Sequence, residues 1–141
     1  MKYTYILLAS LYLSGAFVLH ASAYDAAESI GHSALDTETL LSSYIGGCED
    51  AHDLAAMVSV GAVILNRCGE PCFPDTISAN GASLGIFPVP APSPMAVYAA
   101  RLALSGLDPT AGATFFFKSV DTTAQGDRYI TFSVSGLCFA R

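Results

Sequence analysis

The chain has 141 residues with six basic and twelve acidic side chains, a net charge of −6 when the histidines are neutral. This length suits one domain rather than two. The negative charge argues against a nucleic-acid partner, because nucleic acids attract basic proteins. An anionic polymer would have to be bound through shape, hydrogen bonds and stacking.

The first 23 residues have the pattern of a secretory signal peptide. Residues 1–5 contain one lysine, residues 6–19 are mostly apolar, and residues 21–23 read A-S-A, a typical cleavage site. We expect a secreted or extracytoplasmic chain that begins at Tyr24 and has no stable membrane association after cleavage. An uncleaved membrane anchor is the alternative, which the short apolar run disfavours.

Residues 24–36 are predicted to be a flexible N-terminal segment, and residues 37–141 the folded domain. Asp36 can cap a helix over residues 37–45, which Gly46 and Gly47 would end.

A second helix is predicted from the acidic segment at residues 50–53 to Arg67. It is apolar at three- and four-residue spacing and small or apolar on the opposite face, which is typical of a helix buried on all sides. Asp50 or Asp53 can cap its first turn, and Arg67 suits the helix dipole in its last turn.

The remaining elements follow from turn residues and β-branched or aromatic runs. Residues 68–78 are predicted to be a loop and residues 79–94 an irregular connection. Ser93 and Pro94 open a third helix that Gly106 stops. Strands are expected over residues 113–117 and 130–134, with residues 137–140 as a continuation of the second strand past Gly136 and a loop at 121–127. The sequence therefore predicts an α+β domain, about three helices followed by a small antiparallel sheet.

Four cysteines in a secreted chain indicate two disulfides, for which three pairings exist. The pairing Cys68–Cys72 with Cys48–Cys138 is favoured, because the first two lie close together in the sequence. A zinc site built from Cys48, His52, Cys68 and Cys72 is an alternative whose spacings fit structural zinc sites poorly.

Two groups of residues are candidates for chemistry. Residues 81–85 match the nucleophile-elbow pattern G-x-S-x-G, but prolines follow and every histidine precedes Ser83, so a chance match is the better interpretation. The acidic segment before the second helix is the other candidate. A carboxyl group partly walled by apolar side chains can donate a proton, as glycoside cleavage requires. The plain alternative is that these residues cap the helix and face water.

Three stretches resemble the signature of the SleB/CwlJ-like cell wall hydrolases, the spore cortex-lytic enzymes. They read VSVGAVILNR at residues 58–67, CFPDTIS at 72–78 and LDPTAGATFFF at 107–117. The order and spacing agree over roughly Leu40 to Phe139. The resemblance implies a small lysozyme-like α+β domain that cleaves the glycan strands of peptidoglycan, in the cell wall or the spore cortex, without a metal or cofactor. Some members of the family act as lytic transglycosylases.

The resemblance also implies site residues. One glutamate just before the central helix would act as general acid and base, and Glu49 is its candidate here. Ser83, Phe87 and Phe117 fall in the family's groove motifs and are the candidate substrate-binding residues.

The chain departs from the family pattern at several polar positions. Alignment without a gap places the family's catalytic glutamate at Cys48, one residue before Glu49. Its second glutamate falls at His52 and its late histidine at Leu137. The alternative function is therefore a catalytically inactive relative, a disulfide-stapled glycan-binding or envelope-structural protein. A redox or metal protein built on the cysteines is a third hypothesis. The oligomeric state is not predicted.

Overall fold

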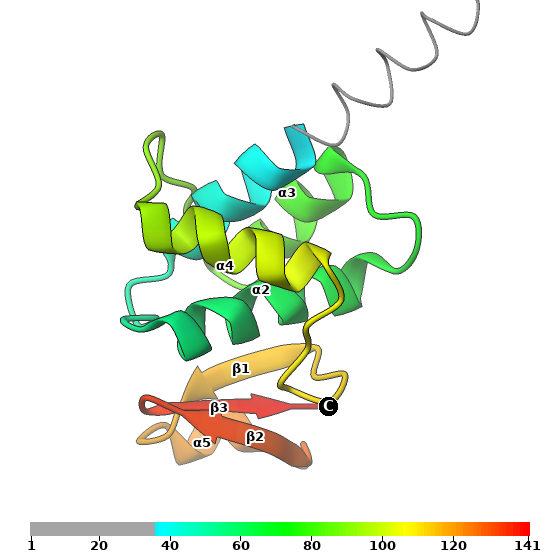
Figure 1. Ribbon diagram of the computed structural model, residues 1–141. Coiled ribbons are helices and arrows are strands. Elements are labelled where there is room, and N and C mark those ends of the chain that lie inside the picture. The colour runs from blue at the N-terminus through cyan, green and yellow to red at the C-terminus, as the bar shows by residue number, and fades with distance from the viewer. Residues whose placement is uncertain (1–35) are drawn as a thin grey trace, which may run out of the picture. The chain divides into compact units, whose positions relative to one another are not determined.

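The computed structural model describes residues 36–141, so the predicted signal peptide and most of the N-terminal segment lie outside the described residues. The longer helices lie on one side of a small antiparallel sheet (Figure 1), which confirms the predicted α+β class. In chain order, the elements are a helix over residues 36–47, α2 (Leu54–Cys68), α3 (Pro74–Ser83), α4 (Pro94–Leu104), β1 (Phe115–Lys118), α5 (Thr122–Gln125), β2 (Ile130–Val134) and β3 (Leu137–Ala140). None of the helices within residues 36–141 is long and apolar enough to cross a bilayer.

Helix α2 is enclosed by protein along most of its length, as predicted. Asp53 occupies the N-cap, where its side chain accepts a hydrogen bond from the Ala56 amide at 2.8 Å. The buried stretch includes Gly61, which allows two other helices to approach closely. A Cβ at this position would lie 2.9 Å from Ile45 Cδ1 and 3.1 Å from Ala103 Cβ.

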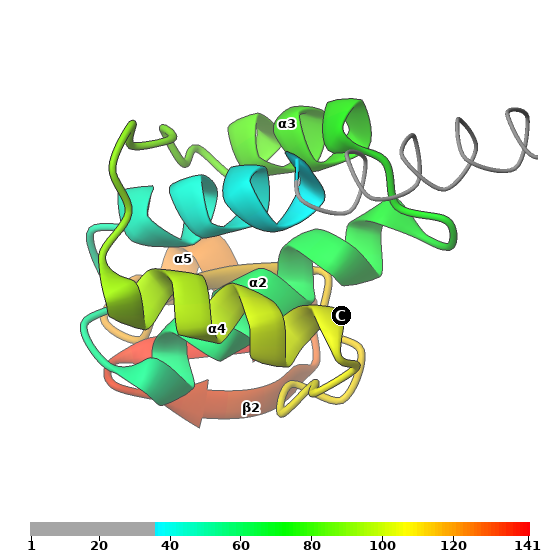
Figure 2. The ribbon, with the colours of Figure 1, turned by 45° about the horizontal axis from the view of Figure 1, so that its top comes forward.

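The helix over residues 36–47 lies between α3 and α4 (Figure 2). Toward α4, Glu38 Oε1 accepts a hydrogen bond from Arg101 Nε at 2.8 Å. Toward α3, Tyr44 occupies the space beside Gly81, where a Cβ would lie 2.3 Å from Tyr44 Cδ1. Residue 36 is already helical, so the predicted cap at Asp36 is wrong.

The sequence predicted a loop over residues 68–78 and an irregular connection after it. This prediction is wrong for residues 74–83, which form helix α3. The helix begins at Pro74, because a missing N–H costs nothing at the first helical position. Only Ile77 and Gly81 of this helix are buried. Two core residues make too short an apolar pattern to mark a helix in the sequence. Residues 84–93 are irregular, as predicted.

Helix α4 confirms the predicted third helix. Ser93 caps it by accepting a hydrogen bond from the Ala96 amide at 3.2 Å, and Pro94 is its first residue. Gly106 follows its end with a φ of 95°, a conformation that favours glycine.

The sheet has the strand order β1-β3-β2, with both neighbouring pairs antiparallel. The stretch 137–140 does not continue β2, because Ser135 and Gly136 turn the chain with φ of 51° and 79°. It returns as β3, the central and fully buried strand. The predicted loop at 121–127 contains the short helix α5.

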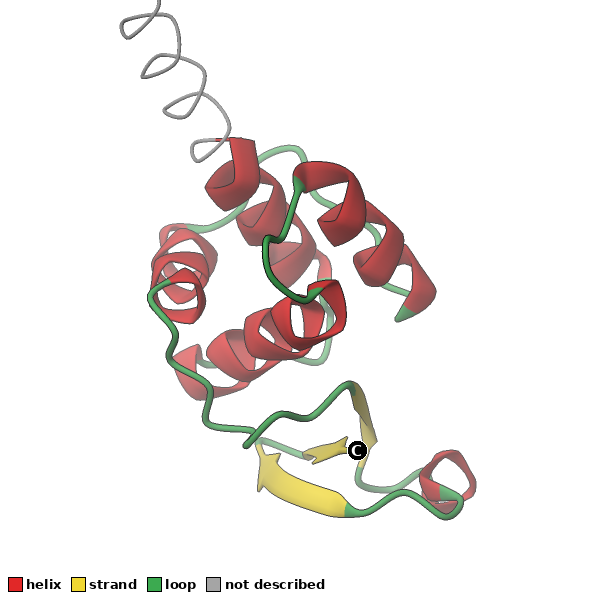
Figure 3. Ribbon diagram, turned by 90° about the vertical axis from the view of Figure 1, so that its right-hand side faces the viewer, coloured by secondary structure: helices red, strands yellow, loops and turns green. Residues whose placement is uncertain are grey.

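Alternation along the strands divides the sheet into two faces. The inner face packs on the helices and carries Phe116, Phe132 and Phe139. The outer face carries a smaller cluster formed by Phe117 and Cys138 with Ala124 of α5. Figure 3 shows the helices on one side of the sheet and α5 away from them.

The cysteines form one disulfide, not two. Cys68 and Cys72 are bonded, with their Cα atoms 5.2 Å apart, as predicted. The predicted Cys48–Cys138 disulfide is wrong, because both residues are free thiols. Cys48 belongs to the main core and Cys138 to the outer cluster, so the sheet separates them. The disulfide also uses Cys68 and Cys72, two ligands of the alternative zinc site. Among the described residues, no three histidine, cysteine, aspartate or glutamate side chains are grouped so that they could hold a metal ion.

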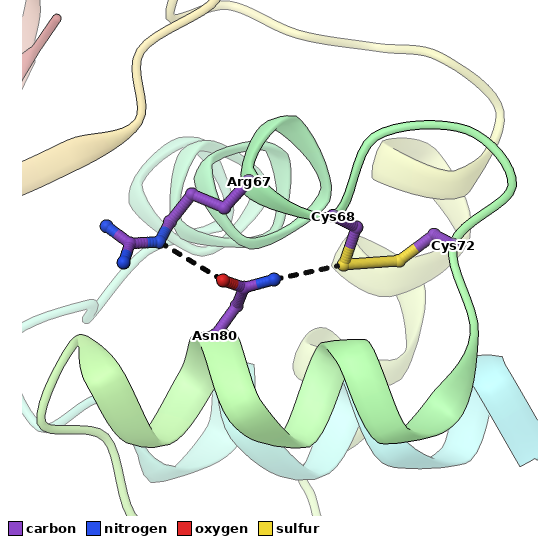
Figure 4. Close-up of a disulfide and its surroundings, with 4 residues drawn as sticks. All are labelled: Arg67, Cys68, Cys72 and Asn80. Atoms are coloured by element: carbon purple, nitrogen blue, oxygen red, sulfur yellow. Dashed lines mark hydrogen bonds between the residues drawn. A yellow bond between two sulfur atoms is a disulfide. The ribbon is translucent and has the colours of Figure 1, made fainter.

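The disulfide ties the end of α2 to the loop that leads into α3, and Asn80 of α3 reinforces the connection (Figure 4). The Asn80 amide nitrogen donates to Cys68 Sγ at 3.6 Å, and its oxygen accepts from Arg67 Nε at 3.4 Å. Arg67 also donates to the Thr114 carbonyl at 2.9 Å, which links α2 to the chain just before β1.

The turn after α4 is organised by one carboxylate. Asp108 accepts hydrogen bonds from Asn66 Nδ2 at 3.0 Å, from Thr110 N and Oγ1 at 2.8 and 2.6 Å, and from Gly112 N at 2.8 Å. Burial opposes ionisation of this carboxyl. The hydrogen bonds outweigh burial and hold the pKa of Asp108 below its ordinary value.

Thiol titration of the unfolded, unreduced protein tests the cysteine assignment. We expect two reactive thiols per chain, from Cys48 and Cys138, and four after reduction. A count of zero before reduction would mean that a second disulfide exists and would contradict the structure.

Replacement of Asp108 by Asn should make the free energy of unfolding depend less on pH in the acid range. A lowered native pKa stabilises the fold above the unfolded-state pKa of about 3.9, and this contribution is lost as the pH falls through the native pKa. The variant should therefore be less stable than the parent at pH 7, by about 1–3 kcal/mol for lost hydrogen bonds to a charge. Urea unfolding at pH 7 and pH 3 measures the difference in the free energy of unfolding between parent and variant. If that difference is as large at pH 3 as at pH 7, the lowered pKa of Asp108 is contradicted.

Candidate active site

Two of the cavities among the described residues are similar in size. The larger, about 540 Å³, lies between the C-terminal ends of α2 and α4 and includes Glu70 and Asp108. Asp108 is committed to the turn described above. The second is a groove of about 480 Å³ formed by residues 46–50, residues 84–89 and Phe116. It contains the predicted catalytic residue Glu49, and we therefore take this groove as the candidate site.

The acidic segment forms a tight turn between two helices. The Cys48 amide donates to the Ile45 carbonyl at 3.2 Å, and the Ala51 amide donates to the Cys48 carbonyl at 3.1 Å. Cys48 and Ala51 have buried side chains that anchor the segment in the core. Burial raises the pKa of the Cys48 thiol, so it stays a neutral core side chain.

Glu49 lies between these anchors with its side chain exposed. Its carboxylate makes no hydrogen bond or ion pair with any residue in the range 36–141. It is therefore available to a ligand in the groove.

The adjacent carboxylate is not available in the same way. Asp50 Oδ1 accepts a hydrogen bond at 2.9 Å from Nζ of Lys118, the last residue of β1. The hydrogen bond to Asp50 and the attraction of its charge raise the pKa of Lys118. The groove thus holds one free carboxylate and one that is paired with an ammonium group.

A second contact fixes the acidic segment to the sheet. Asp53 accepts a hydrogen bond from the hydroxyl of Ser135, at the tip of the β2–β3 turn. The hydrogen bond from the Ala56 amide and then that from Ser135 lower the pKa of Asp53. The segment 48–53 is therefore held between the core, the end of β1 and the β2–β3 turn.

The opposite wall of the groove is the irregular stretch 84–89. Ser43 and Val89 join this stretch to the helix over residues 36–47, because Val89 N donates to the Ser43 carbonyl at 3.1 Å and the Ser43 hydroxyl donates to the Val89 carbonyl. Ile86 is buried, whereas Phe87 is 82% exposed. This stretch presents an aromatic ring to solvent in the same groove as Glu49.

The structure brings only some of the predicted site residues together. Glu49 and Phe87 both line the groove. Ser83 does not, since its hydroxyl accepts from Arg67 at 2.8 Å and donates to the Asn80 carbonyl at 2.9 Å. It ends helix α3, which also fits the rejection of a nucleophile elbow.

Phe117 is on the wrong side of the sheet for the groove. It belongs to the outer cluster, and its neighbour Phe116 is the aromatic residue that lines the site. Strand alternation in residues 115–117 shows that Phe116 and Phe117 face opposite ways, but it does not say which faces the helices. The Asp50–Lys118 pair was also missed, because no local pattern links residues so far apart in the chain.

Comparison with known families identifies the domain. Residues 51–140, more than half of the chain, match the family described as cell wall hydrolase. The chain belongs to the cell wall hydrolase family. The matched region begins just after Glu49. No curated protein matches the chain in sequence.

Two solved structures have the same fold as this family member. One is the catalytic domain of the Bacillus cereus SleB protein, with a TM-score of 0.59 and 24% identity, covering 76% of this chain and 91% of that one. The other is the catalytic domain of the germination-specific lytic transglycosylase SleB from Bacillus anthracis. It has a TM-score of 0.58 and 24% identity, and covers 75% of this chain and 94% of that one. Both similarities confirm the predicted lysozyme-like fold.

Replacement of Gly47 by Ala tests how the groove is built. A Cβ at this position would lie 1.8 Å from the Phe87 carbonyl oxygen, a backbone atom that no rotamer change can move. We expect a loss of about 1–3 kcal/mol in urea unfolding. Gly46→Ala is the matched control, because its Cβ would lie 3.0 Å from the Val89 side chain, which can adjust. Equal stability of the two variants would contradict the described packing.

Proposed function

We propose that this protein cleaves the glycan strands of peptidoglycan, in the cell wall or the spore cortex, with Glu49 as the single general acid and base. The observation that carries the proposal is the free carboxylate of Glu49 in the groove, next to a carboxylate that is already paired. Membership of the cell wall hydrolase family supports the substrate class. The fold shared with a lytic transglycosylase supports the reaction class.

The chemistry needs one group that exchanges a proton at two stages. Protonated Glu49 donates its proton to the glycosidic oxygen as the bond from that oxygen to C1 breaks. The resulting carboxylate then removes a proton from the oxygen that attacks C1. If that oxygen is the sugar's own 6-hydroxyl, a 1,6-anhydro ring forms, and if it is water, a reducing end forms.

The charge arrangement favours internal ring closure. Hydrolytic glycosidases use two carboxylates, one as acid and the other as base or nucleophile. Here Asp50 is held by Lys118, so the groove offers only Glu49 for proton transfer. A reaction that reuses one carboxylate and needs no positioned water suits this site.

Glycan binding would rely on the walls of the groove rather than on charge. The exposed ring of Phe87 and the partly buried ring of Phe116 offer apolar surfaces against which sugar rings can pack. The groove that these rings line has a volume of about 480 Å³. This mode of binding suits an acidic protein acting on an anionic polymer.

The proposed substrate also requires export. The signal-like N-terminus supports a secreted or extracytoplasmic location, with no stable membrane association once it is removed. The intramolecular disulfide suits an oxidising compartment.

A glycan-binding protein without activity is the second candidate. It is favoured by the buried thiol of Cys48 at the position where alignment without a gap expects a glutamate, and by a family match that starts only at residue 51. Such a protein would bind insoluble peptidoglycan but release no soluble fragments.

Glutamate replacement separates these functions. Glu49→Gln should reduce release of soluble fragments from purified peptidoglycan or cortex at least about 100-fold, the usual range for loss of a general acid. Glu70→Gln is the matched control, because Glu70 is an exposed carboxylate at the other cavity. Undiminished release by Glu49→Gln would exclude its role.

Position 48 provides the complementary test. If the parent chain binds peptidoglycan without releasing fragments, and Cys48→Glu gains release, the inactive-relative interpretation is correct. If the parent chain is active and Cys48→Glu adds nothing, Glu49 is the functional acid.

A further inference from the structure

The described residues contain two ion pairs, and one of them borders the candidate site. Arg101 and Glu38 join two helices, whereas Lys118 and Asp50 lie at the groove. Lys118 is 58% and Asp50 38% exposed at the side chain, so the pair contributes little to stability. Its position beside Glu49 suggests a different role.

Several charged and titratable groups lie near Glu49 in the sequence or at the groove. On its own segment it has the neutral thiol of Cys48 and the carboxylate of Asp50, with His52 and Asp53 further along. Lys118, at the end of β1, is the cation among these groups, and the charge of Glu49 is among those that stabilise its ammonium form. The opposite wall, residues 84–89, and the β2–β3 turn at residues 135–136 contribute no titratable side chain.

We propose that Lys118 is a positioning residue for the reaction: by pairing with Asp50 it compensates the neighbouring negative charge and fixes the turn that carries Glu49. The inference rests on the proposed function for its role in catalysis. Its structural content does not, because the contact holds the turn at residues 48–53 whether or not a substrate turns over.

Each partner of the pair depends on the other for charge compensation. Without Lys118, the carboxylate of Asp50 is left uncompensated next to Glu49 in the sequence, and without Asp50 the ammonium of Lys118 is uncompensated. Either loss removes the contact between the turn that carries Glu49 and the end of β1.

The lost contact also affects where the turn lies. The Lys118–Asp50 contact is one of the two side-chain links that hold the acidic segment to the sheet, the other being Asp53 with Ser135. Loss of one link lets the turn shift relative to the groove. This should lower kcat more than it raises KM, because misplacement affects the proton transfer more than the apolar contacts that bind the sugars.

The test is amide hydrogen exchange, read by NMR, across residues 48–53 in the full chain and in its variants. Lys118→Met and Asp50→Asn should each speed exchange in this turn, and the double variant should exchange no faster than either single variant, because each change removes the same contact. Arg101→Met is the matched control, since it removes the same charge by breaking the other ion pair, whose residues do not line the groove. Lys118→Arg, which keeps the charge, should exchange like the parent.

Activity profiles on solubilised glycan strands then test the catalytic role. In Lys118→Met, kcat should fall about 10-fold with little change in KM, and Lys118→Arg should recover most of the lost kcat. Exchange rates and kcat values that coincide in Lys118→Met and the parent overturn the inference, even if Glu49→Gln abolishes activity. If Glu49→Gln retains full activity, the proposed function fails instead, and the exchange measurement still decides whether Lys118 holds the turn.

Discussion

The burial of α2 is the constraint on which the other elements depend. Residues 58–64 of this helix are all buried, so three other helices and the sheet must cover it on every side. Gly61 sets the closest approach to the neighbouring helices. Because the N-terminus of this helix is fixed by the Asp53 cap, the turn immediately before it is fixed as well. The candidate acid lies in that turn, so the position of Glu49 follows from the packing of the core.

The groove is formed by segments that have little regular structure of their own. Its walls are the turn at residues 46–50 and the stretch 84–89, and each is held by a few specific contacts to helices or strands. Such segments can vary in sequence while the core stays constant, since their positions depend on the elements that carry them. An apolar core of this kind can therefore be kept while the residues of the groove change.

The sequence predicted the elements that have a strong pattern of their own. Helices α2 and α4 and strand β2 were recognised because their periodicity and caps are local. Helix α3 was missed because its two buried residues, Ile77 and Gly81, make no visible period. The pairing of Cys48 and the roles of Phe116 and Phe117 depend on which side of the sheet each residue occupies, and this is decided by tertiary packing. The Asp50–Lys118 pair joins distant parts of the chain and leaves no local signal.

Mass analysis of the fragments released from purified peptidoglycan and spore cortex tests the central claim most directly. Cleavage by one unpaired carboxylate predicts soluble fragments that end in 1,6-anhydro-muramic acid, lighter by one water than the hydrolytic products. Reducing ends alone would contradict internal ring closure and would mean that water attacks C1. No release from either substrate by a chain that is folded by circular dichroism would contradict the assignment of Glu49 as a catalytic acid and favour a glycan-binding role.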